Sequence, residues 1–163
     1  MRPSKFNKLR FLLNSIGGLL FLALFAVFII QIIARFGFNY PLPWTDEAAV
    51  ILYIWVILWA SAFMVPAREH VVFDLIWNSV GKRTRQIMAI IGNLLIGGLA
   101  LIGLPATWDY VKFMQREGTP VLELPFFWVY LPLVLLMAAL VIRSAWSIVQ
   151  AVQGKGLESE LIL

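Results

Sequence analysis

The sequence of 163 residues contains no cysteine and a single histidine, His70. The absence of cysteine excludes disulfide bonds, thiolate metal sites and a cysteine nucleophile. One histidine excludes a bis-histidine haem held by this chain alone. Charged residues are also scarce, at 13%, whereas 61% of the residues are hydrophobic. No ordinary soluble domain of this size could bury so much apolar surface, so the composition indicates a membrane protein.

Four apolar runs are long enough to cross a bilayer as helices. They cover residues 11–34, 48–65, 87–107 and 126–146. At about 1.5 Å per residue, each run is long enough for a hydrocarbon core of about 30 Å. The sequence therefore predicts an all-α integral membrane protein with four transmembrane helices. Its membrane domain covers residues 11–150, between a basic tail at 1–10 and a second tail at 151–163.

A cleaved signal peptide is the alternative for the first run, because basic residues precede it. The run is too long for the core of a signal peptide, however, and no small-x-small cleavage site follows it. We therefore expect a retained helix.

The distribution of lysine and arginine predicts the topology. Ten basic residues lie in the N-terminal tail, the segment between the second and third runs, and the C-terminal end, against three in the other two loops. Cytoplasmic segments carry the excess of such residues, so both termini should be cytoplasmic. This arrangement also explains the net charge of +4 without a nucleic-acid partner. Aromatic residues near the span ends are expected to anchor at the membrane surfaces: Trp44, Trp108, Tyr110, Trp128, Tyr130 and Trp146.

Residues 71–81 predict a short amphipathic helix between the second and third spans. Its apolar residues fall on one helical face, and Asp74, Asn78 and Lys82 fall on the other. The segment is too short to cross the bilayer, so an interfacial helix on the cytoplasmic surface fits best. An extension of the third span is the alternative.

Chemistry-bearing patterns are few. The sequence contains no H-E-x-x-H, no Gly-rich phosphate loop and no G-x-S-x-G, and no ionisable residue lies in the middle of a run. Proton relays and ion ligands of transporters are ionisable groups within the membrane. We therefore expect neither an enzyme nor a self-contained ion site, and no cofactor or metal.

The start of the second span holds two carboxylates. Thr45 or Asp46 suits the N-cap position of the helix, and Glu47 suits its first turn, near the positive end of the helix dipole. Glu47 has an alternative role at the span edge, in an ion pair with Arg35 or with a partner chain.

Other residues indicate packing between helices. Trp55 lies about 12 Å below Glu47, close to mid-bilayer, where tryptophan is unusual. It is expected to contact either a partner or the chain's own core, with Trp59 one turn later. Ala89, Asn93, Gly97 and Ala100 form one stripe on the third span.

A charged cluster, Arg68-Glu69-His70, follows the second span. It is either a solvated cytoplasmic cluster or the element that fixes the turn into the interfacial helix. In the second case Asp74, four residues after His70, is the expected partner.

The order of these motifs resembles the small membrane subunit of the tripartite ATP-independent periplasmic (TRAP) transporters, the DctQ-like family. The matching motifs are A-R-F-x-F-N, P-W-T-D-E, a tryptophan in the second span, R-E-H-V-x-F-D and P-F-F-W-V-Y-L-P. The resemblance covers roughly residues 14–150. Its characteristic positions are Arg35, Asn39, Trp44, Glu47, Trp55, Arg68, His70 and Asp74. Where the family often has Leu-Gly, this chain has Trp59-Ala60.

The resemblance implies a scaffold subunit in the bacterial inner membrane, for sodium-driven uptake of an organic acid. Its implied partners are a large membrane subunit, which holds the substrate and sodium sites, and a periplasmic substrate-binding protein. The residues expected to contact partners or support the scaffold are Arg35, Trp44, Glu47, Trp55, Trp59, Arg68, His70, Asp74 and Asn93. Two alternatives remain: a self-sufficient homo-oligomeric exporter, for which Glu47 is the only candidate carboxylate, and a membrane anchor for an enzyme complex.

Overall fold

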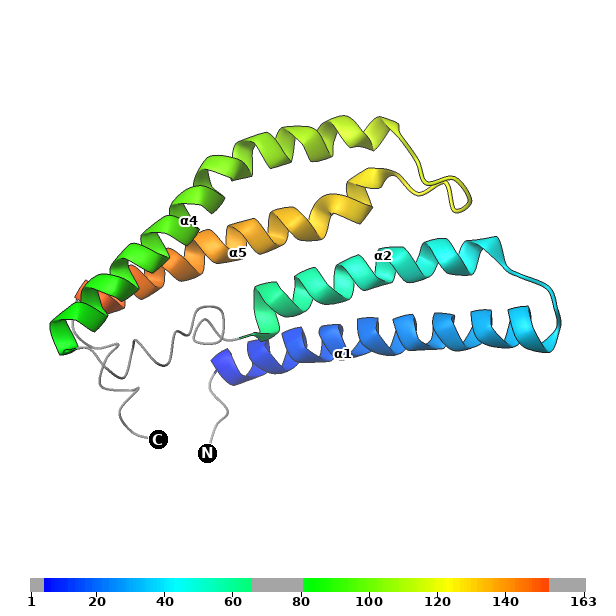
Figure 1. The fold of residues 1–163 in the computed structure, drawn as a ribbon, viewed down its shortest axis with the longest axis horizontal. Coiled ribbons are helices and arrows are strands. Elements are labelled where there is room, and N and C mark those ends of the chain that lie inside the picture. The colour runs from blue at the N-terminus through cyan, green and yellow to red at the C-terminus, as the bar shows by residue number, and fades with distance from the viewer. Residues whose placement is uncertain (1–4, 66–80, 153–163) are drawn as a thin grey trace. The chain divides into compact units, whose positions relative to one another are not determined.

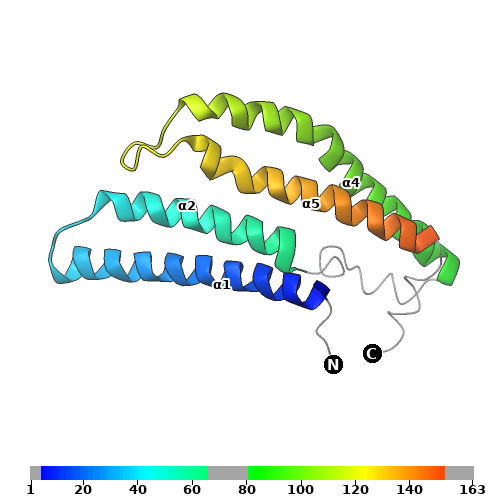
Figure 2. The ribbon, with the colours of Figure 1, turned by 180° about the vertical axis from the view of Figure 1, so that it is seen from behind.

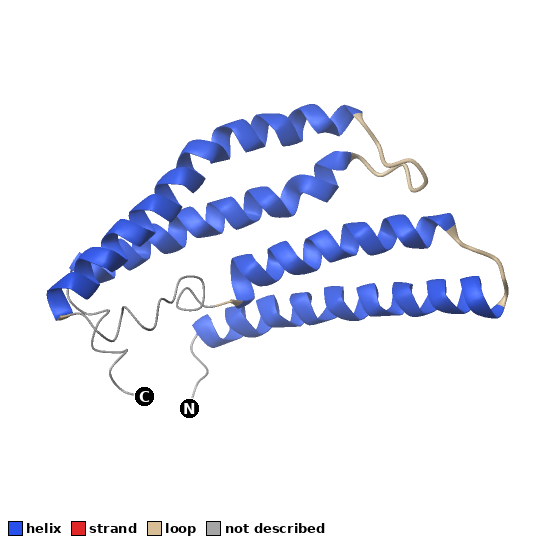
Figure 3. Ribbon diagram, in the orientation of Figure 1, coloured by secondary structure: helices blue, strands red, loops and turns tan. Residues whose placement is uncertain are grey.

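The computed structural model describes residues 5–65 and 81–152 (Figure 1). The predicted interfacial helix, together with Arg68, His70 and Asp74, lies outside these described residues. Within them the regular elements are helices joined by loops (Figure 3). One isolated β-bridge pairs Gly118 with Pro125.

Four long helices make up the described part of the chain. They are α1 (Lys5–Ile32), α2 (Pro43–Trp59), α4 (Lys82–Phe113) and α5 (Phe126–Val152). α1 continues into a π-helical turn, η1 (Ile33–Gly37), α2 into a second, η2 (Ala60–Met64), and α4 into a 3₁₀ turn, η4 (Met114–Arg116). The apolar helical stretches contain 30, 22, 30 and 27 residues, each long enough to cross a bilayer. The predicted all-α fold with four membrane-spanning helices is confirmed.

The start of α2 differs from the prediction. Pro43 is the first helical residue and Leu42 is the N-cap, with extended backbone angles and no side-chain capping bond. Proline is favoured at this position because its fixed φ suits the helix and its missing N–H costs nothing there. Thr45 instead donates its hydroxyl to the Leu42 carbonyl at 2.6 Å. The prediction that Thr45 or Asp46 caps the helix is therefore wrong.

The helix formed by α1 and η1 ends in a turn that backbone hydrogen bonds stabilise. The Phe38 and Tyr40 amides donate back to the carbonyls of Ile33 and Ala34. Asn39 between them has φ of 53°, in the left-handed region that asparagine tolerates better than most residues. These bonds satisfy carbonyls at the helix end and turn the chain toward Pro43.

The chain forms two compact units. Among the described residues, unit 1 comprises residues 5–64 and 108–136, and unit 2 comprises residues 65, 81–107 and 137–152. In unit 1, α1 and α2 run side by side in opposite directions (Figures 1 and 2). The C-terminal end of α4 and the N-terminal end of α5 complete it, with Val111 and Pro132 fully buried. Unit 2 contains the remaining parts of α4 and α5.

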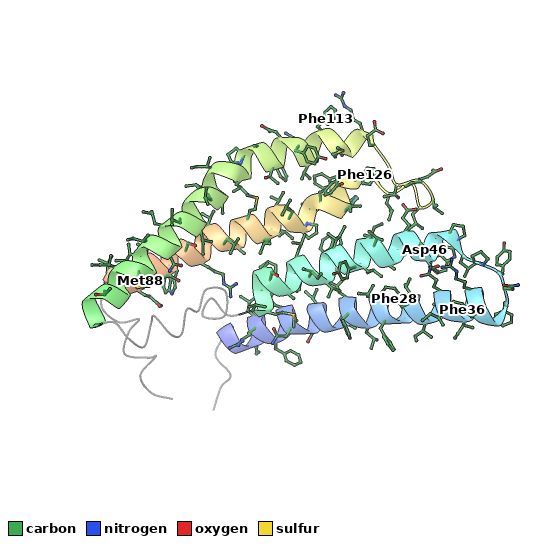
Figure 4. All side chains as sticks on the ribbon, viewed as in Figure 1. Phe28, Phe36, Asp46, Met88, Phe113 and Phe126 are labelled. Carbon is green, nitrogen blue, oxygen red and sulfur yellow. The ribbon has the colours of Figure 1, made fainter. Side chains whose placement is uncertain are left out.

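Most large apolar side chains are exposed. Phe28 of α1 and Phe36 of η1, for example, have exposed fractions of 46% and 80%, and both are labelled in Figure 4. Such a surface is stable in lipid or against another protein.

Candidate functional site

Four polar side chains of α2 bond to other segments of unit 1. We call Asp46, Glu47, Trp55 and Trp59 the α2 polar set. Asp46 and Trp59 bond to α1, Glu47 bonds to the connection between α4 and α5, and Trp55 bonds to α5. Side chains of α2 therefore form hydrogen bonds with α1, with α5 and with the connection between α4 and α5.

Glu47 binds the connection at residues 117–125. Its Oε2 atom accepts hydrogen bonds from the amides of Val121 and Leu122, at 2.9 and 3.1 Å. The prediction of a first-turn role next to the helix dipole, or of a pair with Arg35, did not anticipate these partners. Glu47 joins two segments more than 70 residues apart in the sequence.

The connection is shaped to present those two amides. The Glu123 amide returns to the Thr119 carbonyl, which closes a single helical turn around Pro120. The first amides of such a turn have no backbone acceptor, so they form a ready site for an anion. Further bonds tie Leu124 to the Thr119 backbone and hydroxyl, at 2.9 and 3.0 Å.

The second carboxylate oxygen of Glu47 differs from the first in its hydrogen bonding. Oε1 is buried and has no hydrogen-bond partner among the described residues, although the Thr119 side chain lies beside the carboxylate. Thr119 itself is only 5% exposed.

Asp46 acts between α1 and α2. Its side chain points toward α1 (Figure 4), where Oδ1 accepts a hydrogen bond from Gln31. In lipid, hydrogen bonds of this kind help helices to associate, because apolar contact alone provides little preference for protein over lipid.

The two tryptophans of the set donate to backbone carbonyls. Trp55 Nε1 lies 3.0 Å from the Trp128 carbonyl in α5, and Trp59 Nε1 lies 3.1 Å from the Leu13 carbonyl in α1. Trp59 also packs on Phe63, with ring centroids 4.6 Å apart. Of the two expectations for Trp55, the chain's own packing accounts for its indole N–H.

The aromatic residues around Trp128 are relevant to how deep in the bilayer Trp55 lies. Trp128 packs on Phe127, which contacts Trp108, and Tyr110 contacts Tyr130 nearby on the same two helices. Trp108, Tyr110, Trp128 and Tyr130 are residues predicted to lie at the membrane surface. A mid-bilayer position for Trp55 does not fit with a surface position for Trp128, because the two residues are hydrogen-bonded.

The other predicted contact residues are dispersed. Arg35 lies in η1, exposed and without an ion pair to any described residue. Trp44, in the first turn of α2, is 38% exposed. Asn93 donates to the Ala89 carbonyl of its own helix at 2.9 Å, so this bond does not join two helices. Contact of these residues with a partner stays a prediction.

Close packing of small residues characterises the contact between α4 and α5 in unit 2. Gly97 of α4 lies against Ser144 of α5, and Gly103 lies against Met137. Ala100, between the two glycines, is buried. The predicted small-residue stripe on the third span is therefore correct for Gly97 and Ala100. Arg143 donates to the Val65 carbonyl in the same unit.

Sequence reasoning missed the Trp128 carbonyl as an acceptor, the role of Thr119, and the Val121 and Leu122 amides. Pro132 offered a signal for the first of these, because a proline inside a helix frees the carbonyl four residues earlier. The described residues contain no group of three His, Cys, Asp or Glu side chains suited to a metal ion.

Comparison with known proteins gives a consistent result. A sequence profile described as "Tripartite ATP-independent periplasmic transporters, DctQ component" matches residues 24–154. The chain is 33% identical over 81 residues to the sialic acid TRAP transporter permease protein SiaT of Haemophilus influenzae (strain 86-028NP). It is 25% and 31% identical, over 80 and 94 residues, to the C4-dicarboxylate TRAP transporter small permease proteins DctQ of Vibrio cholerae and Rhodobacter capsulatus.

These matches cover about half of the chain: 50%, 49% and 55%. They span less than half the length of each relative: 13% of the sialic acid permease and 34% and 40% of the two small permeases. The profile match, in contrast, covers most of the chain and includes α2, α4 and α5 in full.

Proposed function

The chain belongs to the DctQ component family of the tripartite ATP-independent periplasmic transporters, and on that premise we propose that it is the small scaffold subunit of such a transporter. The family is a transporter component rather than an enzyme. With four helices long enough to cross the bilayer, the chain is a multi-pass protein of the bacterial inner membrane.

The transport reaction belongs to a larger partner in this proposal. The small subunit packs beside a large membrane subunit that holds the substrate and sodium sites, and a periplasmic binding protein delivers the substrate. The substrate is a small organic acid. This class is supported by the names of the relatives, which are a sialic acid permease and two C4-dicarboxylate small permeases.

One observation supports a scaffold rather than a carrier above all others. The two carboxylates at the start of α2 are both engaged by the chain itself, Asp46 by Gln31 and Glu47 by two loop amides. Carboxylates that serve ion or proton pathways lie within the membrane and must be available to that ion. Glu47 instead holds two distant segments together, as suits a part that stays in place while another subunit moves.

The test is reconstitution in liposomes with a sodium gradient. We expect substrate uptake when this chain, its large subunit and the binding protein are all present, and no uptake with this chain alone. Uptake by this chain alone would support the exporter alternative. Full activity of the large subunit without this chain would overturn its role as a required scaffold.

Glu47→Gln separates the scaffold from the carrier more finely. For a scaffold, the variant should lose transport only to the extent that assembly with the large subunit is lost. Normal assembly with abolished transport would contradict the proposal, because it would give Glu47 a direct part in coupling. Asp46→Asn is the matched control at the neighbouring carboxylate.

Both termini are cytoplasmic in this proposal, on the evidence of the ten basic residues against three. Because the natural chain has no cysteine, single cysteines can be introduced without removing any. A membrane-impermeant maleimide added to spheroplasts should label a cysteine at Glu117 and leave one at Ser4 unlabelled. Labelling at position 4 but not at position 117 would show that the topology is opposite to the proposed one.

The outer connections are the proposed contact with the binding protein. Residues 35–47 and 109–123 carry five acids and three bases. Asp109, Glu117 and Glu123 are exposed, unlike the engaged Glu47. Charge reversal at Glu117 and Glu123 should weaken binding-protein docking and make it less sensitive to salt, as for other electrostatically steered contacts. An unchanged affinity would remove this surface from the proposal.

A further inference from the structure

The Trp55–Trp128 hydrogen bond coincides with a defect in α5. Pro132 lies inside α5 and is fully buried. Proline has no backbone N–H, so the carbonyl four residues earlier loses its helical partner. That carbonyl belongs to Trp128, the acceptor of the Trp55 indole N–H at 3.0 Å.

The carbonyl that loses its helical bond needs another donor. Prolines in membrane helices are tolerated because neighbouring groups or ordered waters replace the missing donor, and here the neighbouring group is the Trp55 indole. The indole N–H is suited to this role because tryptophan is a donor without an acceptor. It satisfies the carbonyl and leaves no unpaired atom of its own.

We propose that Trp55 is the replacement donor for the bond that Pro132 removes, so that Trp55 and Pro132 work as one latch between α2 and α5. The proline creates an acceptor that an intact helix would use internally. The tryptophan on α2 then becomes the partner that α5 requires. The N-terminal end of α5 is thereby held to α2 at one defined register.

Trp59 provides an internal comparison. Its indole N–H also donates to a helix carbonyl, that of Leu13, at 3.1 Å. The residue four positions after Leu13 is Gly17, which retains its backbone N–H inside α1. The Leu13 carbonyl therefore keeps its i+4 helical donor with or without Trp59, whereas Pro132 removes that donor from the Trp128 carbonyl.

A double-mutant cycle tests the latch on the full chain. Trp55→Phe keeps an aromatic ring and removes the N–H, and Pro132→Ala returns an amide to α5. The measurement is the reversible unfolding equilibrium in mixed micelles with increasing sodium dodecyl sulfate. We expect Trp55→Phe to lower the folding equilibrium constant about three- to tenfold in the natural background. In the Pro132→Ala background the loss should be less than half as large on the logarithmic scale.

Trp59→Phe is the matched control. Its effect should be smaller and should be the same in the natural and the Pro132→Ala backgrounds, because its acceptor does not depend on the proline. An equal effect of Trp55→Phe in both backgrounds would overturn the latch. The same conclusion would follow if Pro132→Ala reduced the effects of both tryptophan substitutions equally, since that would be general stabilisation.

Poor folding of a variant does not end the test. If Trp55→Phe does not fold, Pro132→Ala should restore the folded yield of that variant but not of an equally damaged Trp59 variant, and failure to restore it would refute the latch. If Pro132→Ala leaves too large a space at this buried position, Pro132→Val returns the same amide with a volume closer to that of proline. The cycle requires neither a substrate nor a partner subunit, so its outcome is independent of the proposed transport function.

Discussion

Two Gly-Gly pairs, one in each unit, show how differently the two units hold their helices together. Gly17-Gly18 lies in α1 of unit 1, and Gly97-Gly98 lies in α4 of unit 2. In each pair the first glycine touches a neighbouring helix, and the second has no described atom within 4 Å of the position of an added Cβ. The pattern of contact is the same, but the contacted atoms are not.

The contacted atoms decide how much each first glycine matters. A Cβ at Gly97 would lie 2.5 Å from the Ser144 Cβ, an atom fixed to the α5 backbone. A Cβ at Gly17 would meet the flexible thioether of Met64 and the edge of Trp59. Unit 2 therefore depends on close approach of two backbones. Unit 1 keeps an adaptable contact there and relies on the hydrogen bonds of the α2 polar set.

The largest effect is expected at the rigid contact. Gly97→Leu should destabilise the chain by about 3 kcal/mol, because the added side chain forces α4 away from α5. Gly98→Leu, one position later, should change stability by about 0.5 kcal/mol or less, because it points into open space. Unfolding in sodium dodecyl sulfate measures both. Equal effects of the two substitutions would mean that close approach at Gly97 is unimportant.

The second-largest effect is expected in unit 1, at the hydrogen bonds that Glu47 accepts. Glu47→Ala leaves the Val121 and Leu122 amides without an acceptor, so hydrogen exchange at these two amides should change from protected to fast. Glu47→Gln should give an intermediate result, since an amide oxygen accepts more weakly than a carboxylate. Hydrogen exchange followed by mass spectrometry reads this directly. Unchanged protection of residues 121–122 would show that the connection folds without Glu47.

A smaller effect on stability is expected at Asn39, where the turn after η1 requires a left-handed backbone conformation. Asn39→Val should cost about 1–2 kcal/mol, because a β-branched residue resists the left-handed conformation at φ of 53°. Asn39→Gly should be close to neutral at the same position. Thermal denaturation in detergent distinguishes the two. If both substitutions destabilise equally, the asparagine side chain rather than its φ angle is what matters.

The smallest effects are expected at the flexible contact. Gly17→Ala should cost about 1 kcal/mol, because Met64 can move aside. Gly18→Ala should be neutral or stabilising by up to about 1 kcal/mol, through higher helix propensity. Unfolding in sodium dodecyl sulfate measures both effects. A Gly17→Ala effect as large as that of Gly97→Leu would remove the distinction between the two units.

The sequence predicted the helices better than the site. The four spans and the small-residue contact at Gly97 were visible as patterns, and Glu47 and Trp55 were selected as candidate contact residues. The acceptors and donors that these side chains use were not, because they are backbone groups. The Val121 and Leu122 amides and the Trp128 carbonyl leave no mark in the identity of their own residues.

The cap of α2 was predicted wrongly for a related reason. Thr45 and Asp46 both have side chains that suit an N-cap, but Pro43 starts the helix two and three positions earlier. Once they lie inside the helix, their side chains take other partners, Leu42 for Thr45 and Gln31 for Asp46.

By itself, the sequence determined that this chain has four helices able to span a membrane, because span length and apolar composition are set locally by the thickness of the bilayer. Its match to the DctQ profile is likewise a property of the sequence. Only the tertiary structure decided which groups meet across the helices. Hydrogen-bond partners depend on the relative register of elements that lie far apart in the chain. That register places Glu47 against the connection of α4 and α5, and Trp55 against the carbonyl that Pro132 leaves free.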